Sequence, residues 1–343
     1  MTAGPITEVL LNQKKIDWKD AIYTVEVADT PFLALVKEGK KPVQVEGNWP
    51  VMKRSRGAIT AIPDGTPVGQ TNHQTRRSLK SVAQWMREAW GVSHFAQLTE
   101  SYGVADEAKF QKAEALIRLR NNMERLFLST QDCAREGAGT VPAAANQLRG
   151  IGKWLESDAA NINSEYPIHE DVRVGSSCVY SGSLANFKDT TLEGMLLAAA
   201  KQRLAPVTLD LHLGPALKSA MDDWTQHDSH VTATNAPLVQ YQAQAKDKTY
   251  LKMVDFFTFS SGTVRAHQNF NIMWDTATGE PTAYTDASGY GLDMTNGWEV
   301  RFMQQLTHAD LPADGSGPRG VWDTTLMLAC MMPAGQIMIK INS

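Results

Sequence analysis

Alternating apolar and polar positions predict a pair of extended strands early in this chain. Apolar side chains occupy odd positions from residue 43 onward, at Val43, Val45, Trp49 and Val51. A period of two is typical of a β-strand. Glycine and proline interrupt regular structure across residues 57–69, and residues 79–92 again have an extended pattern. We therefore expect a hairpin arm with a Gly/Pro-rich tip.

A different period follows the arm and predicts a long helix. Apolar positions at three- and four-residue spacing run through residues 104–135, with Asp106 and Glu107 in the first turn. Such a helix would be about 48 Å long at about 1.5 Å per residue. A shorter helix is expected to begin at Pro31, capped by Asp29 or Thr30, and to end at residues 37–39.

The C-terminal half alternates between helical and extended patterns. Helices are expected at residues 192–204 and 215–224, and strands at residues 207–213, 250–259, 264–274 and 335–341. Residues 260–262 would join two of these strands into a hairpin. The helix, strand and second helix expected over residues 192–224 form an α/β unit.

Charge changes how the arm is interpreted. The 343-residue chain has a net charge of −4, yet residues 37–90 contain ten Lys or Arg and four Asp or Glu. A two-stranded arm with little apolar content is not stable by itself, so we expect it to lie on an acidic surface. Since the rest of the chain is acidic, that surface is expected on another copy of the protein.

Composition and motifs argue against several other classes of protein. No window approaches 18 consecutive apolar residues, the first residues lack a signal-peptide pattern, and no block of five Lys or Arg occurs. The three cysteines, Cys133, Cys178 and Cys330, form no CxxC pair and are expected to be unreactive thiols. Neither a GxxxxGK[ST] nor a GxGxxG loop is present.

Candidate chemistry is sparse. The clusters at residues 169–171 and 227–230 contain metal-ligand residue types but read as loops, and residues 175–178 lack the pattern of a nucleophile elbow. Trp85 and Trp90 beside Arg87 would suit base stacking or, alternatively, packing where the arm joins the body. We therefore expect no catalytic, cofactor-binding or metal-binding residues.

The order of these segments resembles a known family. The run Ala-Asp-Thr-Pro-Phe-Leu-Ala-Leu at residues 28–35, Gly-Asn-Trp at 47–49, the long helix, and Arg-Gly-Ile-Gly-Lys-Trp at 149–154 occur in this order. The chain thereby resembles the major capsid proteins of tailed bacteriophages, which have the Hong Kong 97 fold, and this likeness implies an α+β fold. The likeness is strongest over residues 28–155 and weaker over residues 156–290.

The resemblance implies a division of the chain. Residues 1–40 would form an N-terminal arm, 41–92 the extended β-hairpin loop, 93–190 a peripheral domain with spine helix 104–135, 191–245 the axial domain, and 246–343 the remaining axial strands and the peripheral-domain sheet. Residues 250–274 and 322–341 would supply the sheet beside the spine.

The resemblance also implies a structural, non-enzymatic function. The protein would self-assemble into hexamers and pentamers of an icosahedral or prolate shell around double-stranded DNA, in the cytoplasm of a bacterial host, and reside in the virion. Further partners would be a scaffolding protein, a portal, a decoration protein and the DNA, contacted without sequence specificity. The inter-subunit contacts of the loop would be Trp49, Lys53, Arg54, Arg56, Arg76, Arg77 and Lys80.

Three alternatives stay open. In some relatives a loop lysine is covalently bonded to an asparagine of another subunit, and Lys53 or Lys80 would be the donor here, although no partner is marked. An encapsulin-like compartment would use the same fold to enclose a cargo enzyme. A cytoplasmic hydrolase with an unrecognised site is the alternative from another class.

Overall fold

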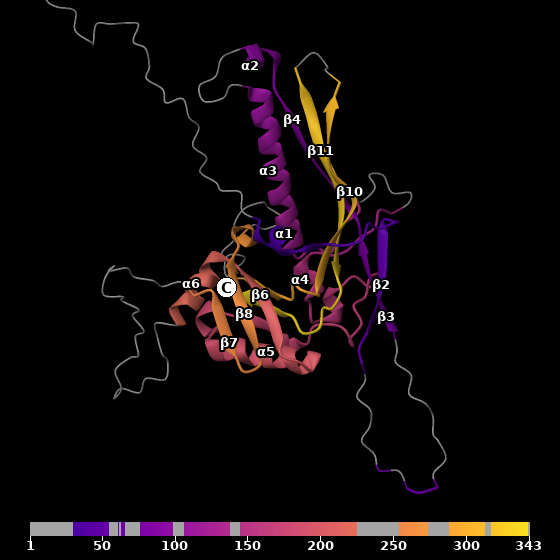
Figure 1. The fold of residues 1–343 in the computed structure, drawn as a ribbon, viewed down its shortest axis with the longest axis vertical. Helices are drawn as coiled ribbons and strands as arrows, with labels where there is room; N and C mark the ends of the chain where they lie inside the picture. The colour runs from indigo at the N-terminus through magenta and orange to yellow at the C-terminus, as the bar shows by residue number, and fades with distance from the viewer. Residues whose placement is uncertain are drawn as a thin grey trace, which may run out of the picture.

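The computed structural model describes residues 30–54, 61, 63–65, 76–98, 106–137, 145–224, 254–273, 288–312 and 317–341. Most of the expected tip, Arg56, Trp274 and the cluster at 227–230 lie outside these residues. The described chain is α+β, as expected, with two larger sheets and a separate two-stranded hairpin (Figure 1).

One lobe is built on a six-stranded sheet (Figure 1). Its strand order is β5 (Val179–Gly182), β12 (Ile337–Ile341), β9 (Gly289–Leu292), β6 (Val207–Leu213), β8 (Gly262–Gln268) and β7 (Phe256–Phe259). Two helices pack on it, α5 (Asp189–Arg203) and α6 (Pro215–Trp224). The odd-numbered apolar residues of β6 are buried in the core, which matches its alternating pattern.

The second lobe combines a long helix with a four-stranded sheet (Figure 1). The strand order is β1 (Lys37–Glu38), β10 (Trp298–Leu311), β11 (Arg319–Cys330) and β4 (Gln84–Gly91). The spine helix α3 (Glu107–Phe127) lies along this sheet, and the short helix α2 (His94–Leu98) lies near its start. Contacts such as the hydrogen bond from Trp322 Nε1 to the Lys112 carbonyl, 3.0 Å, hold the helix to β11.

The spine helix is shorter than the expected residues 104–135. Asp106 is its N-cap and accepts a hydrogen bond from the Lys109 amide, so the helix proper begins at Glu107. It ends at Phe127 because the Ser129 hydroxyl donates to the Leu126 carbonyl and the chain then leaves the helix axis. The 21 residues span about 32 Å, not about 48 Å.

Residues 79–92 are two strands in different sheets, so the single strand expected there is wrong. β3 (Arg76–Val82) pairs with β2 (Glu46–Met52), whereas β4 pairs with β11. Alternation fails at Val82 and Ala83, which are both buried, and the Ala83 amide donates to the Val45 carbonyl at 2.7 Å. The chain therefore changes sheets at Ala83.

Two further expectations for the C-terminal half need correction. Phe270–Met273 form a 3₁₀ turn (η5), because Asn269 Oδ1 accepts from the Asn271 amide and bends the chain after β8. In addition, β7, β8 and β12 belong to the six-stranded sheet and not to the sheet beside the spine. β11 does lie beside the spine, and β6 and α6 have the expected bounds.

The remaining short elements lie between α3 and α5 along the chain. They are α4 (Ile151–Trp154), η2 (Ala159–Asn161), η3 (Ser176–Cys178) and η4 (Leu184–Asn186). Together with the sheets they enclose a continuous core that includes Phe32, Phe127 and Trp298.

A buried carboxylate ties the N-terminal helix α1 (Pro31–Leu35) to both lobes. Thr30, an expected cap, makes no side-chain capping bond. Instead Glu124 of α3 accepts hydrogen bonds from the amides of Phe32, 2.8 Å, and Leu33, 2.9 Å, and from Asn269 Nδ2, 2.7 Å. These charge-assisted bonds explain how a fully buried glutamate is tolerated.

Candidate assembly surface

The base of the arm is locked to the body by Trp49. This side chain is 6% exposed and pairs across the hairpin with the buried Leu79. Its Nε1 donates to the Cys330 carbonyl at 3.1 Å. At Gly47, two residues earlier, an added Cβ would lie 2.5 Å from Met327 Sδ, so a side chain there would displace the end of the Met327 side chain of β11.

Alternating cationic and aromatic groups extend this anchor. The Arg301 guanidinium lies 5.4 Å from the Trp49 ring, Trp49 lies 5.8 Å from Trp154, and Arg149 lies 4.9 Å from Trp154. Arg149 is buried and bonds Asp132 at 2.8 Å, which compensates its charge. Such stacking stabilises a desolvated cation. The Arg-Gly-Ile-Gly-Lys-Trp run therefore supports the arm.

Two of the basic residues expected at the subunit contact are already paired within the chain. Arg77 Nε lies 3.2 Å from Asp171 Oδ2, and Lys80 Nζ lies 2.9 Å from Glu46 Oε1. The hydrogen bond to Glu46 raises the pKa of Lys80 above its ordinary value. Both pairs lie on the flank of the hairpin and are partly solvated, so each contributes little to stability.

The other described basic residues at the end of the hairpin have no such partner among the described residues. Lys53, Arg54 and Arg76 are exposed, and none forms an ion pair with a described residue. Arg76 is paired in register with Met52, which is 45% exposed, so these groups cluster where the described hairpin ends. Figure 1 shows β2 and β3 directed away from the spine helix. The arm thus presents its uncompensated charge beyond the body.

Trp85 and Trp90 have different roles. The Trp90 ring stacks on His308, and its Nε1 bonds His308 Nε2 at 3.0 Å. Trp85 is 57% exposed, with the Arg87 guanidinium 4.3 Å from its ring. Arg87 is held by a two-pronged contact to Asp323, at 2.7 and 3.1 Å. Packing where the arm rejoins the body is the interpretation that fits Trp90.

The structure shows no catalytic or metal-binding arrangement at the clusters of residues 169–171 and 175–178. Asp171 of the 169–171 cluster pairs with Arg77, and burial raises the pKa of the Cys178 and Cys133 thiols to about 11. Within the described ranges, no group of three or more His, Cys, Asp or Glu is placed to hold a metal ion. None of the described helices combines the length and apolar character needed to cross a membrane.

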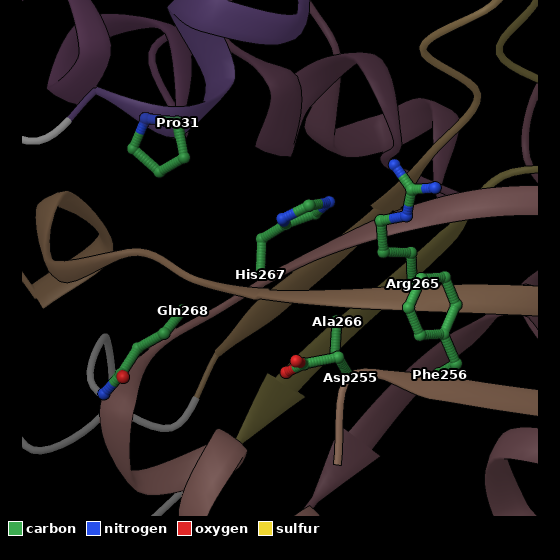
Figure 2. A pocket seen from close by; sticks show the side chains of 7 residues that line it. All are labelled: Pro31, Asp255, Phe256, Arg265, Ala266, His267 and Gln268. Carbon is green, nitrogen blue, oxygen red and sulfur yellow. The ribbon is translucent and has the colours of Figure 1, made fainter. Parts of the chain in front are cut away.

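A pocket beside β7 and β8 was not expected from the sequence. Figure 2 shows its lining residues, Pro31, Asp255, Phe256, Arg265, Ala266, His267 and Gln268. His267 Nε2 lies 3.2 Å from Asp210 Oδ1, and this hydrogen bond lowers the pKa of Asp210. Arg265 stacks over Phe256 at 5.1 Å. Asp210, Arg265 and His267 at this pocket therefore make contacts within the chain, and these described residues form no recognisable catalytic arrangement.

The described chain thus combines an anchored arm, a spine helix and a sheet-based lobe. Solved structures with this arrangement include the capsid of Cyanophage P-SCSP1u, with TM-score 0.60 and 12% identity, covering 97% of this chain and 94% of that one. Mycobacterium phage Bobi gives TM-score 0.59 and 10% identity, covering 99% and 100%. The capsid of a native GTA particle gives TM-score 0.57 and 10% identity, covering 98% and 97%. The chain therefore has the Hong Kong 97-type fold.

The family follows from the sequence itself. The model of the SU10 major capsid protein family matches residues 5–341. A search of curated proteins found no match. This chain belongs to the SU10 major capsid protein family, and its role is that of a structural protein of a virion capsid.

Proposed function

We propose that the basic arm is the strap through which this capsid protein assembles into hexamers and pentamers of an icosahedral or prolate shell. One observation carries the proposal: the base of the arm is fixed by Trp49, while Lys53, Arg54 and Arg76 have no ion pair among the described residues. Those cations are expected to lie on acidic surfaces of a neighbouring copy. Trp49 then acts as the anchor of the arm and not as part of the contact.

The energetics favour many weak contacts. An exposed ion pair contributes only about 0.2 to 1 kcal/mol. A standard interface buries about 1,600 Å² in total, and closed symmetry repeats it many times. Arms that reach over neighbours add buried area outside each subunit's own fold. The shell is therefore stable although each charged pair is weak.

The other partners belong to this proposal as well. The shell would enclose double-stranded DNA, contacted on its inner face without sequence specificity, and would form in the cytoplasm of a bacterial host. A scaffolding protein, a portal and a decoration protein would complete it. The family match favours this function over an encapsulin-like compartment and over a hydrolase.

Charge reversal on the arm tests the proposal. The double variant Arg54→Glu, Arg56→Glu is expected to remain a soluble subunit and to form no shells, because the arm would repel the acidic neighbour. Size-exclusion chromatography and electron microscopy measure both properties. The matched control is Lys188→Glu, Lys201→Glu, which changes the net charge equally at exposed positions outside the arm. Normal particles from the arm variant would contradict the proposal.

A further inference from the structure

A hydrogen bond between side chains joins two strands that are not neighbours in the four-stranded sheet. Nε1 of Trp90, on β4, donates to Nε2 of His308, on β10, at 3.0 Å. β11 lies between these two strands. The bond passes over β11 at Gly320, where an added Cβ would lie 2.8 Å from both of these nitrogen atoms. Glycine at this position therefore leaves room for a direct link between β4 and β10.

The link fixes where the imidazole of His308 carries its proton. An indole N–H only donates, so Nε2 of His308 must hold a lone pair and the ring proton belongs on Nδ1. The ring is also held in place, because it stacks on Trp90 at 5.9 Å and lies edge-on to Trp322 at 4.9 Å. The hydrogen bond to Trp90 therefore exists only while His308 is neutral.

A second partner with the opposite requirement lies close to the same nitrogen. Asp310 Oδ1 is 3.6 Å from His308 Nε2, which is too far for a hydrogen bond in the present arrangement. A carboxylate only accepts, so it attracts Nε2 when that atom carries a proton. Protonation would also set two N–H donors, those of Trp90 and His308, against each other. The proton on Nε2 therefore decides between Trp90 and Asp310.

The other charged groups around this site keep their charge near neutral pH. Glu88, on the same face of β4, is paired with Arg118 of α3 at 3.0 Å. Lys112 of α3 lies 5.8 Å from the centre of the Trp322 ring. Positions 320, 322 and 324, on this face of β11, carry no charge. Carboxylate, ammonium and guanidinium groups do not titrate in the range where histidine does, so His308 is the group whose charge changes.

We propose that His308 is a proton-operated switch that fastens the edge strand β4 to β10. The neutral ring holds Trp90, whereas the protonated ring turns its Nε2–H to Asp310 and releases Trp90. β4 lies at the edge of its sheet beside the spine helix (Figure 1) and follows directly from the arm at Ala83. A fall in pH should therefore loosen the strand that joins the arm to the body. The switch acts within one subunit and does not depend on assembly.

The position of the ring proton gives the first test. Nuclear magnetic resonance of the dilute free subunit with ¹⁵N-labelled histidine distinguishes a protonated ring nitrogen from one with a lone pair. At about pH 7.5 the His308 signals, identified by their loss in His308→Gln, should show the proton on Nδ1. In Trp90→Phe the proton should move to Nε2, the position that a free histidine side chain favours. A proton on Nε2 in the wild type would overturn the inference.

Hydrogen exchange of the β4 amides gives the second test. Relative to intrinsic rates, exchange in the wild-type subunit should be about fivefold faster at about pH 5.5 than at about pH 7.5, since one neutral hydrogen bond is lost. His308→Gln is the matched control, because its side-chain carbonyl accepts from Trp90 without titrating, and β4 should keep the same protection at both pH values. Effects of acid elsewhere in the protein occur in both chains. In Asp310→Asn the midpoint of the change should move to lower pH, because the protonated ring loses its partner.

Three results of the exchange measurement would contradict the switch. They are equal protection of β4 at both pH values in the wild type, an equal response to acid in His308→Gln, and an unmoved midpoint in Asp310→Asn. Neither measurement involves shells, so a failure of this inference is distinguished from a failure of the proposed function.

Discussion

His212 makes the stability of the subunit depend on pH in a calculable way. The side chain lies on β6 and is 0% exposed, with Phe32 and His267 rings 5.7 and 5.6 Å away. Neither ring nitrogen has a hydrogen-bond partner in the described structure. Burial is the main cause that lowers the pKa of His212 from 6.5 to about 3; the nearby His267 acts in the same direction and Asp210 opposes it.

The sign of the effect follows from proton binding. Between pH 6.5 and about 3 the unfolded chain protonates His212 and the folded chain does not. Stability from the neutral, buried ring is therefore fully present above pH 6.5 and is lost as the pH falls toward 3. From pH 7 to pH 5 this one residue should lower the free energy of unfolding by about 2 kcal/mol.

His212→Phe keeps a buried ring and removes the titration. Urea unfolding of the dilute subunit, followed by tryptophan fluorescence, gives the free energy of unfolding at both pH values. The wild type should lose about 2 kcal/mol more than the variant between pH 7 and pH 5. Comparing the two chains cancels the contribution of the titrating groups that do not interact with His212, whereas His267 and Asp210 are coupled to it. An equal loss in both would refute the assignment of this pH dependence to His212.

Two other predictions test the anchor and the thiols. Trp49→Ala should lower the free energy of unfolding by about 3 to 5 kcal/mol, because it empties a packed site, whereas Lys53→Ala on the exposed arm should change it by less than about 0.5 kcal/mol. Similar values for the two variants in urea unfolding would show that Trp49 does not anchor the arm. All three cysteines are buried, so Ellman's reagent at pH 8 should label the native subunit slowly and the urea-unfolded chain completely. Rapid labelling of the native protein would contradict this picture of buried thiols.

The local sequence pattern correctly predicted those helices and strands whose formation is governed by signals within their own residues. β6 and α6 have the expected bounds, because alternation at residues 207–213 and Pro215 at the first helical position are short-range signals. The hairpin of β7 and β8 also follows from its turn residues. The resemblance in segment order correctly indicated the capsid family and the Hong Kong 97-type fold.

The assembly surface was only partly accessible to sequence reasoning. The excess of positive charge indicated the arm, but the pattern could not separate the paired Arg77 and Lys80 from the exposed Lys53 and Arg54. The ion pair of Arg77, for example, depends on Asp171, which lies 94 residues away in the sequence.

The sequence by itself determined the charge division of this protein, the presence of an arm followed by a spine helix, and, in the C-terminal half, α5, β6, α6 and the hairpin of β7 and β8, but not the long strands β10 and β11. Only the tertiary structure decided where the spine ends, that residues 79–92 divide between two sheets, and that Trp49 belongs to the core. The reason is physical. Periodicity and capping act over a few residues, whereas Trp49 bonds a carbonyl 281 residues away, and Glu124 caps a helix 92 residues before it.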